Sequence, residues 1–288
     1  MKRDTGPARA TRAGVTLIEL MIAMTLLLVV AAIGGVTVRR TLKVQAHLAR
    51  VESRTTTLTD ALRTIGRHAE NADPALGDLR RARDTVLELI HAIGITSICR
   101  TIGDTLVIGS GNDSLPWLSV SPRAVTTDDA VRMWLETPPH WETREISAVG
   151  VASGTCGDTT LGWPDRATQR ITLASTVAGL HVGAPVRVLQ REKWSLVRGG
   201  DGTWALSLAT WDAARNAFTT PQPLASPLAA PSAPDGAGLS LRAIDYAGAP
   251  LPDSALRTAR SLLVTLRTPR HPRDGTLTDS VRINVSHE

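Results

Sequence analysis

The hydrophobic and polar positions divide the chain into three parts. The first is an apolar run from Val15 to Val38, in which Glu19 is the one charged residue. A helix rises about 1.5 Å per residue, so the 24 residues of this run would span about 36 Å, more than the ~30 Å hydrocarbon core of a bilayer. The pattern therefore predicts a transmembrane helix over residues 15–38.

The second part continues the helix in amphipathic form. Apolar positions recur every three or four residues, which places them in one stripe on a helix. They are Val44, Leu48, Val51, Thr55, Leu58, Leu62 and Ile65. Because Pro74 and the residues before it should end the helix, we expect this continuation over residues 39–72. The stripe packs either on the chain's own head or on helices of other subunits.

The third part, residues 73–288, consists of short apolar runs separated by turns, which is typical of β-structure. Gly103-Asp104 lies between two such runs and predicts a hairpin. Residues 199–202 predict a second hairpin, with a cation-binding loop as the alternative. Residues 221–238 are rich in Pro, Ala, Ser and Gly and are expected to form a surface loop. The predicted fold class is α+β, with a long N-terminal helix packed on a mainly antiparallel β head.

Charge is concentrated before the apolar run. The formal net charge is +5, and the leader, residues 1–14, contributes +3 of it. A cationic leader stays in the cytoplasm, so the head should lie on the far side of the inner membrane. The rest of the chain has little excess charge, and no nucleic-acid partner is predicted for the head. An ordinary signal peptide cleaved near Ala32-Ile33-Gly34 and a plain single-span anchor are alternatives.

Glu19 separates these alternatives. A carboxylate in a membrane helix costs roughly 2.5–3.5 kcal/mol at the centre and is functional by default. The stretch Gly14-Val15-Thr16-Leu17-Ile18-Glu19-Leu20 resembles the processing motif of type IV prepilins and type II secretion pseudopilins. The resemblance implies that a prepilin peptidase cuts after Gly14 and methylates the new amino terminus of Val15. Val15 stands where Phe is commonest in that family.

The resemblance also implies a role for Glu19 in assembly. Its carboxylate would pair with the Val15 amine of a neighbouring subunit, so that two charges neutralise each other inside a helix bundle. The alternative is that Glu19 only reaches the membrane interface. The implied partners are the prepilin peptidase, other pilin or pseudopilin subunits, the inner membrane and its assembly platform. The implied location is the bacterial inner membrane, then a filament or the cell surface after assembly.

The head weakly resembles minor pilins and J-type pseudopilins. The resemblance rests on the head's size, on the run 182–188 with the hairpin after it, and on the strand 280–285. It implies a minor subunit that assembles into or primes a pilus or secretion pseudopilus. A pilus-tip adhesin or a DNA-uptake minor pilin is the alternative from another class, and a membrane-anchored hydrolase is a third.

The remaining chemistry is sparse. Cys99 and Cys156 are the two cysteines, and outside the cytoplasm they are expected to form a disulfide; two unrelated buried thiols are the alternative. The sequence holds no HExxH, no Walker A loop and no G-x-S-x-G elbow, and its seven histidines are scattered. We therefore expect no cofactor, no metal and no enzymatic activity.

Overall fold

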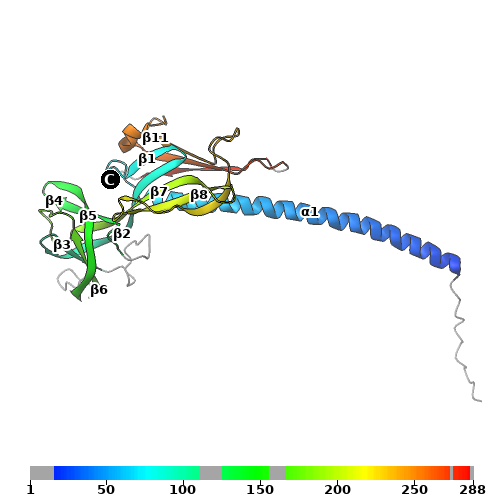
Figure 1. Ribbon diagram of the computed structural model, residues 1–288, viewed down its shortest axis with the longest axis horizontal. Helices are drawn as coiled ribbons and strands as arrows, with labels where there is room; N and C mark the ends of the chain where they lie inside the picture. Colours follow the sequence, from blue (N-terminus) through cyan, green and yellow to red (C-terminus); the bar gives the residue numbers. More distant parts are fainter. Residues whose placement is uncertain (1–15, 110–124, 156–166, 273–274, 286–288) are drawn as a thin grey trace, which may run out of the picture. The chain divides into compact units, whose positions relative to one another are not determined.

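The computed structural model describes residues 16–109, 125–155, 167–272 and 275–285 (Figure 1). The chain divides into two compact units, residues 1–53 and residues 54–288, and we call the second the head unit. The helix α1 (Leu17–Glu70) contributes residues to both units. It ends three residues before Asp73-Pro74, as the sequence predicts.

The first unit is the N-terminal part of α1. Its large apolar side chains are exposed, among them Leu27 at 71 % and Val30 at 68 %. The helix continues through Gly34-Gly35, and Thr37 Oγ1 donates a hydrogen bond to the carbonyl of Ile33 at 3.0 Å, so this hydroxyl is satisfied within the helix. Among the described elements, α1 is the one helix long and apolar enough to cross a membrane.

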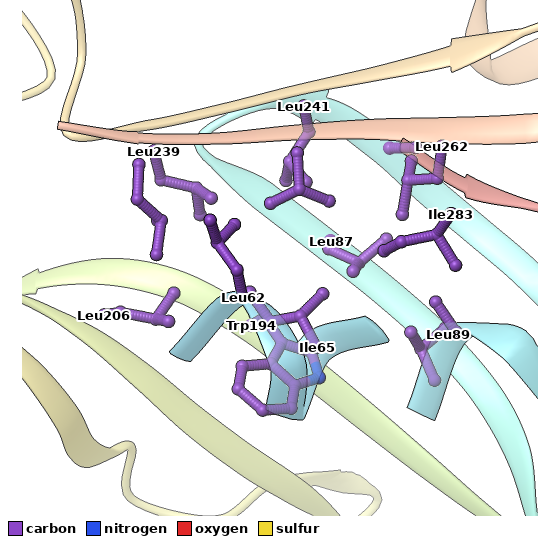
Figure 2. Close-up of a cluster of buried hydrophobic side chains, with 14 of the residues drawn as sticks. Leu62, Ile65, Leu87, Leu89, Trp194, Leu206, Leu239, Leu241, Leu262 and Ile283 are labelled. Carbon is purple, nitrogen blue, oxygen red and sulfur yellow. The ribbon is translucent and has the colours of Figure 1, made fainter. Parts of the chain in front are cut away.

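The last four turns of α1 belong to the head unit and are buried on one side. Leu58, Leu62 and Ile65 are 2 %, 4 % and 0 % exposed. Figure 2 shows Leu62 and Ile65 among side chains from several strands. Thr59 Oγ1 also donates to Asp279 Oδ2 at 3.1 Å. The predicted stripe therefore packs on the chain's own sheet over these turns.

The rest of the head unit is antiparallel sheet with one short 3-10 helix. In chain order the elements are β1 (Leu79–Asp84), β2 (Val86–Ile102), β3 (Thr105–Gly109), β4 (Ala130–Glu136), β5 (Pro139–Thr155), β6 (Ala167–Leu173), β7 (Pro185–Arg198), β8 (Trp204–Asp212), β9 (Ala217–Phe218), β10 (Gln222–Leu228), β11 (Leu239–Ile244), η1 (Asp253–Thr258), β12 (Ser261–Arg267) and β13 (Thr278–Asn284). The predicted hairpins are confirmed, since β3 pairs with β2 and β8 with β7. The α+β prediction is likewise confirmed.

The strands β2 and β7 take part in two sub-structures. Over one half of their length they pair centrally in the sheet order β10-β8-β7-β2-β1-β11-β12-β13, against which α1 packs. Over the other half they close a ring of six strands, β7-β4-β5-β6-β3-β2. The register of β2 on β7 shifts between Ala92 and Gly94, and such a bulge bends a strand. The shift lies where β2 passes from one sub-structure to the other.

Each sub-structure has its own core. The first core joins Leu62 and Ile65 of α1 to apolar side chains of the covering sheet, including Leu87 and Trp194 (Figure 2). The second fills the six-stranded ring and includes Ile98 and Met133. Each fully buried aliphatic side chain contributes about 1.5–3 kcal/mol relative to exposure. Two cores on shared strands explain why β2 is 17 residues long.

A buried ion pair fixes the chain just after α1. Asp78 accepts two hydrogen bonds from the Arg132 guanidinium of β4, at 2.8 Å and 2.5 Å. The same carboxylate accepts from the backbone N–H of Asp73 at 2.9 Å. Asp78 and Arg132 are 2 % and 3 % exposed, so each charge depends on the other.

One prediction about the head is wrong. Residues 221–238 do not form a loop throughout, because 222–228 form β10, which pairs with β8. β10 lies at the end of the sheet order, and proline is tolerated at a sheet edge, where one row of N–H groups needs no partner strand. Ala225 and Leu228 are buried, so the segment contributes to the first core despite its composition.

Candidate functional site

The start of α1 is held by a reciprocal cap. The backbone N–H of Thr16 donates to Glu19 Oε2 at 3.0 Å. In return, the backbone N–H of Glu19 donates to Thr16 Oγ1 at 3.3 Å. This is a capping box, in which two N-terminal donors of a helix are satisfied by side chains. The spacing Thr16-x-x-Glu19 is its sequence signature, and it could have predicted this helix start.

The cap gives Glu19 a local role besides any role in assembly. Its carboxylate lies in the first turn of α1, where the helix dipole favours negative charge. The side chain is exposed in this chain, and among the described residues only Oε2 is engaged in the cap. Oε1 therefore remains accessible to a donor from outside the helix. Gly14 and Val15, the predicted cleavage site, lie outside the described residues.

Comparison with known proteins identifies this same segment. Residues 9–35 match the family model of the prokaryotic N-terminal methylation motif. The match supports a type IV pilin-like, prepilin-type protein. No curated protein and no solved structure matches the chain significantly.

The prepilin-type motif carries several functional consequences. It implies processing by a prepilin peptidase and assembly with other pilin subunits. Its family is one of structural subunits. Together with the single long apolar helix, the motif is consistent with a protein anchored in the inner membrane. The segment that the motif covers includes Gly14, Val15 and Glu19.

The predicted disulfide is described at one end only. Cys99 lies in β2 and is half-buried, whereas Cys156 lies outside the described residues. The pairing stays a prediction.

The head unit also contains a buried polar cluster that no motif predicted. It consists of His68 at the end of α1, His91 of β2 and Glu192 of β7, and we call it the His–Glu cluster. His68 Nδ1 lies 2.7 Å from Glu192 Oε2, and His91 Nε2 lies 3.1 Å from Glu192 Oε1. The two imidazole rings are stacked, with centroids 4.5 Å apart.

Burial makes the His–Glu cluster unusual. His91 and Glu192 are 1 % and 2 % exposed, and the side chain of His68 is 22 % exposed. His91 Nε2 is within ion-pair distance of Glu192 Oε1, and by geometric criteria neither ring nitrogen of His91 makes a hydrogen bond to the described residues. Burial alone would raise the pKa of Glu192, but its contacts with His68 and His91 outweigh this effect and lower the pKa to about 2.

The register of the strands brings the cluster together. Leu87, Leu89 and His91 alternate along β2 and are all buried, so His91 continues the row of side chains that faces α1. Glu192 pairs with Leu89 across the strands and lies on that same face. This alternation was a usable signal for the burial of His91. The contact between His68 and Glu192 joins residues 124 positions apart, and no local pattern encodes it.

Two tryptophans, one in β5 and one in β8, are each covered by an arginine of β7. The Arg187 guanidinium lies 4.5 Å from the ring centroid of Trp141, and that of Arg191 lies 4.0 Å from the ring centroid of Trp211. Arg191 also donates to Glu88 Oε1 at 2.8 Å. These cation–π contacts occupy one face of each indole.

Proposed function

We propose that this chain is a minor prepilin-type subunit that assembles into, or primes, a type IV pilus or a type II secretion pseudopilus. The observation that carries the proposal is the exposed apolar surface of α1, headed by the capped Glu19, inside the segment that matches the methylation motif. An apolar surface of this extent needs a bilayer or other helices around it. A filament subunit has both, first the membrane and then its neighbours.

In this proposal Glu19 stabilises the subunit as it passes from the membrane into the filament. Cleavage between Gly14 and Val15 creates a charged amine beside the apolar run. Glu19 uses Oε2 for its own helix cap, which leaves Oε1 for the Val15 amine of a neighbouring subunit. Pairing removes two isolated charges from an apolar surrounding at once. Methylation of Val15 keeps the amine charged and makes it more apolar.

We propose that the N-terminus of the subunit lies in the cytoplasm and that its head lies outside the inner membrane. The leader's positive charge supports this orientation. The proposed partners are the prepilin peptidase, other pilin or pseudopilin subunits and the inner-membrane assembly platform. The head is large for a bulk filament subunit, which supports a minor position such as that of J-type pseudopilins.

The second candidate function is that of a tip subunit that captures DNA. Whether the rings of Trp141 and Trp211 are open for base stacking is relevant to this candidate. Single-stranded nucleic acid stacks its bases on open aromatic faces. Here Arg187 and Arg191 cover one face of each ring, which supports the structural role over base stacking at these two positions. Binding of labelled single-stranded DNA that Trp211→Ala abolishes would reverse this preference.

The test of the proposal is the mature N-terminus. Mass spectrometry of the chain from its native membrane should find a start at methylated Val15 with the apolar helix retained. Gly14→Phe should leave the precursor uncut, because the peptidase reads the glycine. A mature terminus near Gly35 would instead identify a removed signal peptide. Deleting the gene and scoring surface pili against protein secretion then separates the two machines.

We also propose a disulfide between Cys99 and Cys156. Closing the loop between them would stabilise the head by about 4 kcal/mol in the chain-entropy model. Thiol labelling of the unfolded, unreduced protein should find no free thiol, and reduction should then expose two. Two labelled thiols before reduction, in protein from the native envelope, would exclude the bond.

A further inference from the structure

We infer that the His–Glu cluster is a binding site for a zinc-class divalent cation. His68, His91 and Glu192 each offer one ligand atom, and these atoms all lie within 4.8 Å of one another. They come from three separate elements of the head unit, α1, β2 and β7. The site would therefore form whether or not the protein assembles into a filament.

The strongest indication is the state of His91. A side chain that is 1 % exposed has lost its water, and both of its ring nitrogens lack a hydrogen-bond partner among the described residues. Buried polar groups in native proteins nearly always have a partner. Nε2 lies 3.1 Å from Glu192 Oε1. A metal ion between these groups supplies the missing partner.

The donor set fits zinc better than other common cations. Two imidazole nitrogens and one carboxylate oxygen are ligands that Zn²⁺ prefers, whereas Ca²⁺ and Mg²⁺ take oxygen ligands. Zn²⁺ binds both types at about 2.0–2.2 Å, so tetrahedral ligands lie about 3.3 Å apart. The ligand atoms of the three residues lie within 4.8 Å of one another, so their side chains would move closer together when the ion binds.

The residues around the His–Glu cluster restrict the His68 ring and leave one side of the cluster near solvent. Trp194 is fully buried and makes an edge contact with the His68 ring at 5.5 Å between centroids, which limits how that imidazole can turn. The 22 % exposure of the His68 side chain leaves one side of the cluster near solvent, where a water would complete the coordination. Through the bound ion, the three ligands would cross-link the end of α1 to β2 and β7.

The experiment uses the full-length chain in detergent, stripped of metal with a chelator and titrated with Zn²⁺. We expect one bound equivalent and a higher thermal unfolding midpoint with zinc, because a ligand that binds the native state stabilises it. Glu192→Gln and His68→Gln keep side-chain volume and should each lower the zinc affinity by more than about 100-fold, beyond the usual effect of outer-shell changes. His140→Gln is the matched control, since the side chain of His140 is 42 % exposed.

Two results would overturn the inference. One is a folded wild-type chain that binds no zinc at a single site. The other is an equal loss of zinc affinity in His140→Gln and Glu192→Gln, which would indicate adventitious surface binding. Should both cluster variants fail to fold, X-ray absorption of the zinc-loaded wild type decides the matter without them. Two imidazole ligands support the site, and none or one refutes it.

Discussion

The two ends of α1 carry one apolar stripe, and the positions of this stripe differ in burial. Leu62 is 4 % exposed in the head unit, whereas Leu48, on the same stripe, is 58 % exposed. Both residues are leucines at equivalent positions of the stripe, so the sequence pattern alone does not indicate which of them is buried. The head-end turns therefore belong to the core of the head unit, and the exposed N-terminal turns need a bilayer or other helices around them.

The carboxylates at the two ends differ in the same way. Glu19 is exposed, and among the described residues its carboxylate accepts hydrogen bonds from Thr16 of its own helix. Glu192 is buried and meets His68 in the last turn of α1. Burial ties Glu192 to partners that the fold provides. Exposure leaves Glu19 able to find a partner in another molecule.

The largest expected effect comes from removing the charge of Glu19 while keeping its cap. Glu19→Gln retains the capping box, because Gln serves at that position as Glu does. The Val15 amine of the neighbouring subunit then has no counter-charge, and an unpaired buried charge costs about 3–5 kcal/mol. Filament incorporation, measured by quantifying the subunit in sheared filaments, should fall by about two to four orders of magnitude.

Cleavage after Gly14 is the internal control, since the peptidase reads chiefly the glycine and should process Glu19→Gln normally. Glu19→Ala should behave like Glu19→Gln. If Glu19→Gln assembles as well as the wild type and Glu19→Ala does not, the cap matters and the charge does not.

The second prediction compares the same substitution at two points of the stripe. Leu62→Ala removes a buried side chain and should lower the free energy of unfolding by about 2–5 kcal/mol. Leu48→Ala should change it by less than about 0.5 kcal/mol, as exposed positions do. Chemical denaturation of the full chain in detergent, followed by tryptophan fluorescence, measures both.

Filament incorporation of the same two variants sharpens the result. Leu48→Ala should reduce incorporation while leaving the head stable, because its partner lies in other subunits. Equal destabilisation by both substitutions would mean that Leu48 packs on its own head, and the comparison between the two ends would collapse.

Local sequence patterns predict the long helix and the hairpins of this fold. The ring of six strands and the His–Glu cluster depend on long-range strand pairing, which local patterns do not reveal. The end of α1 near Asp73-Pro74 and the hairpin at Gly103-Asp104 each depend on a few adjacent residues, and both were predictable. The ring of six strands depends on β2 meeting β7, with Thr96 opposite Val186, and no adjacent residues specify that pairing. The same pairing brings His91 into the His–Glu cluster.

Two misses had different causes. The segment 222–228 fell in a predicted loop because residues 221–238 are rich in Pro, Ala, Ser and Gly. A sheet edge accepts Pro223 and Pro227, and buried Ala225 and Leu228 anchor the strand. The cap at Thr16 was overlooked although its spacing to Glu19 is a recognised helix-start pattern. Composition does not reveal an edge strand, whereas the spacing of Thr16 and Glu19 does indicate a helix start.

The smallest expected effect isolates the cap from the charge. Thr16→Ala removes the hydroxyl that accepts the N–H of Glu19 and leaves the Glu19 carboxylate in place. Loss of an N-cap costs about 0.5–2 kcal/mol, so filament incorporation should fall by about fivefold, far less than for Glu19→Gln. Thr16→Ser keeps a capping hydroxyl and should assemble like the wild type, whereas a defect in Thr16→Ala as deep as that of Glu19→Gln would show that the cap, more than the charge pair, governs assembly.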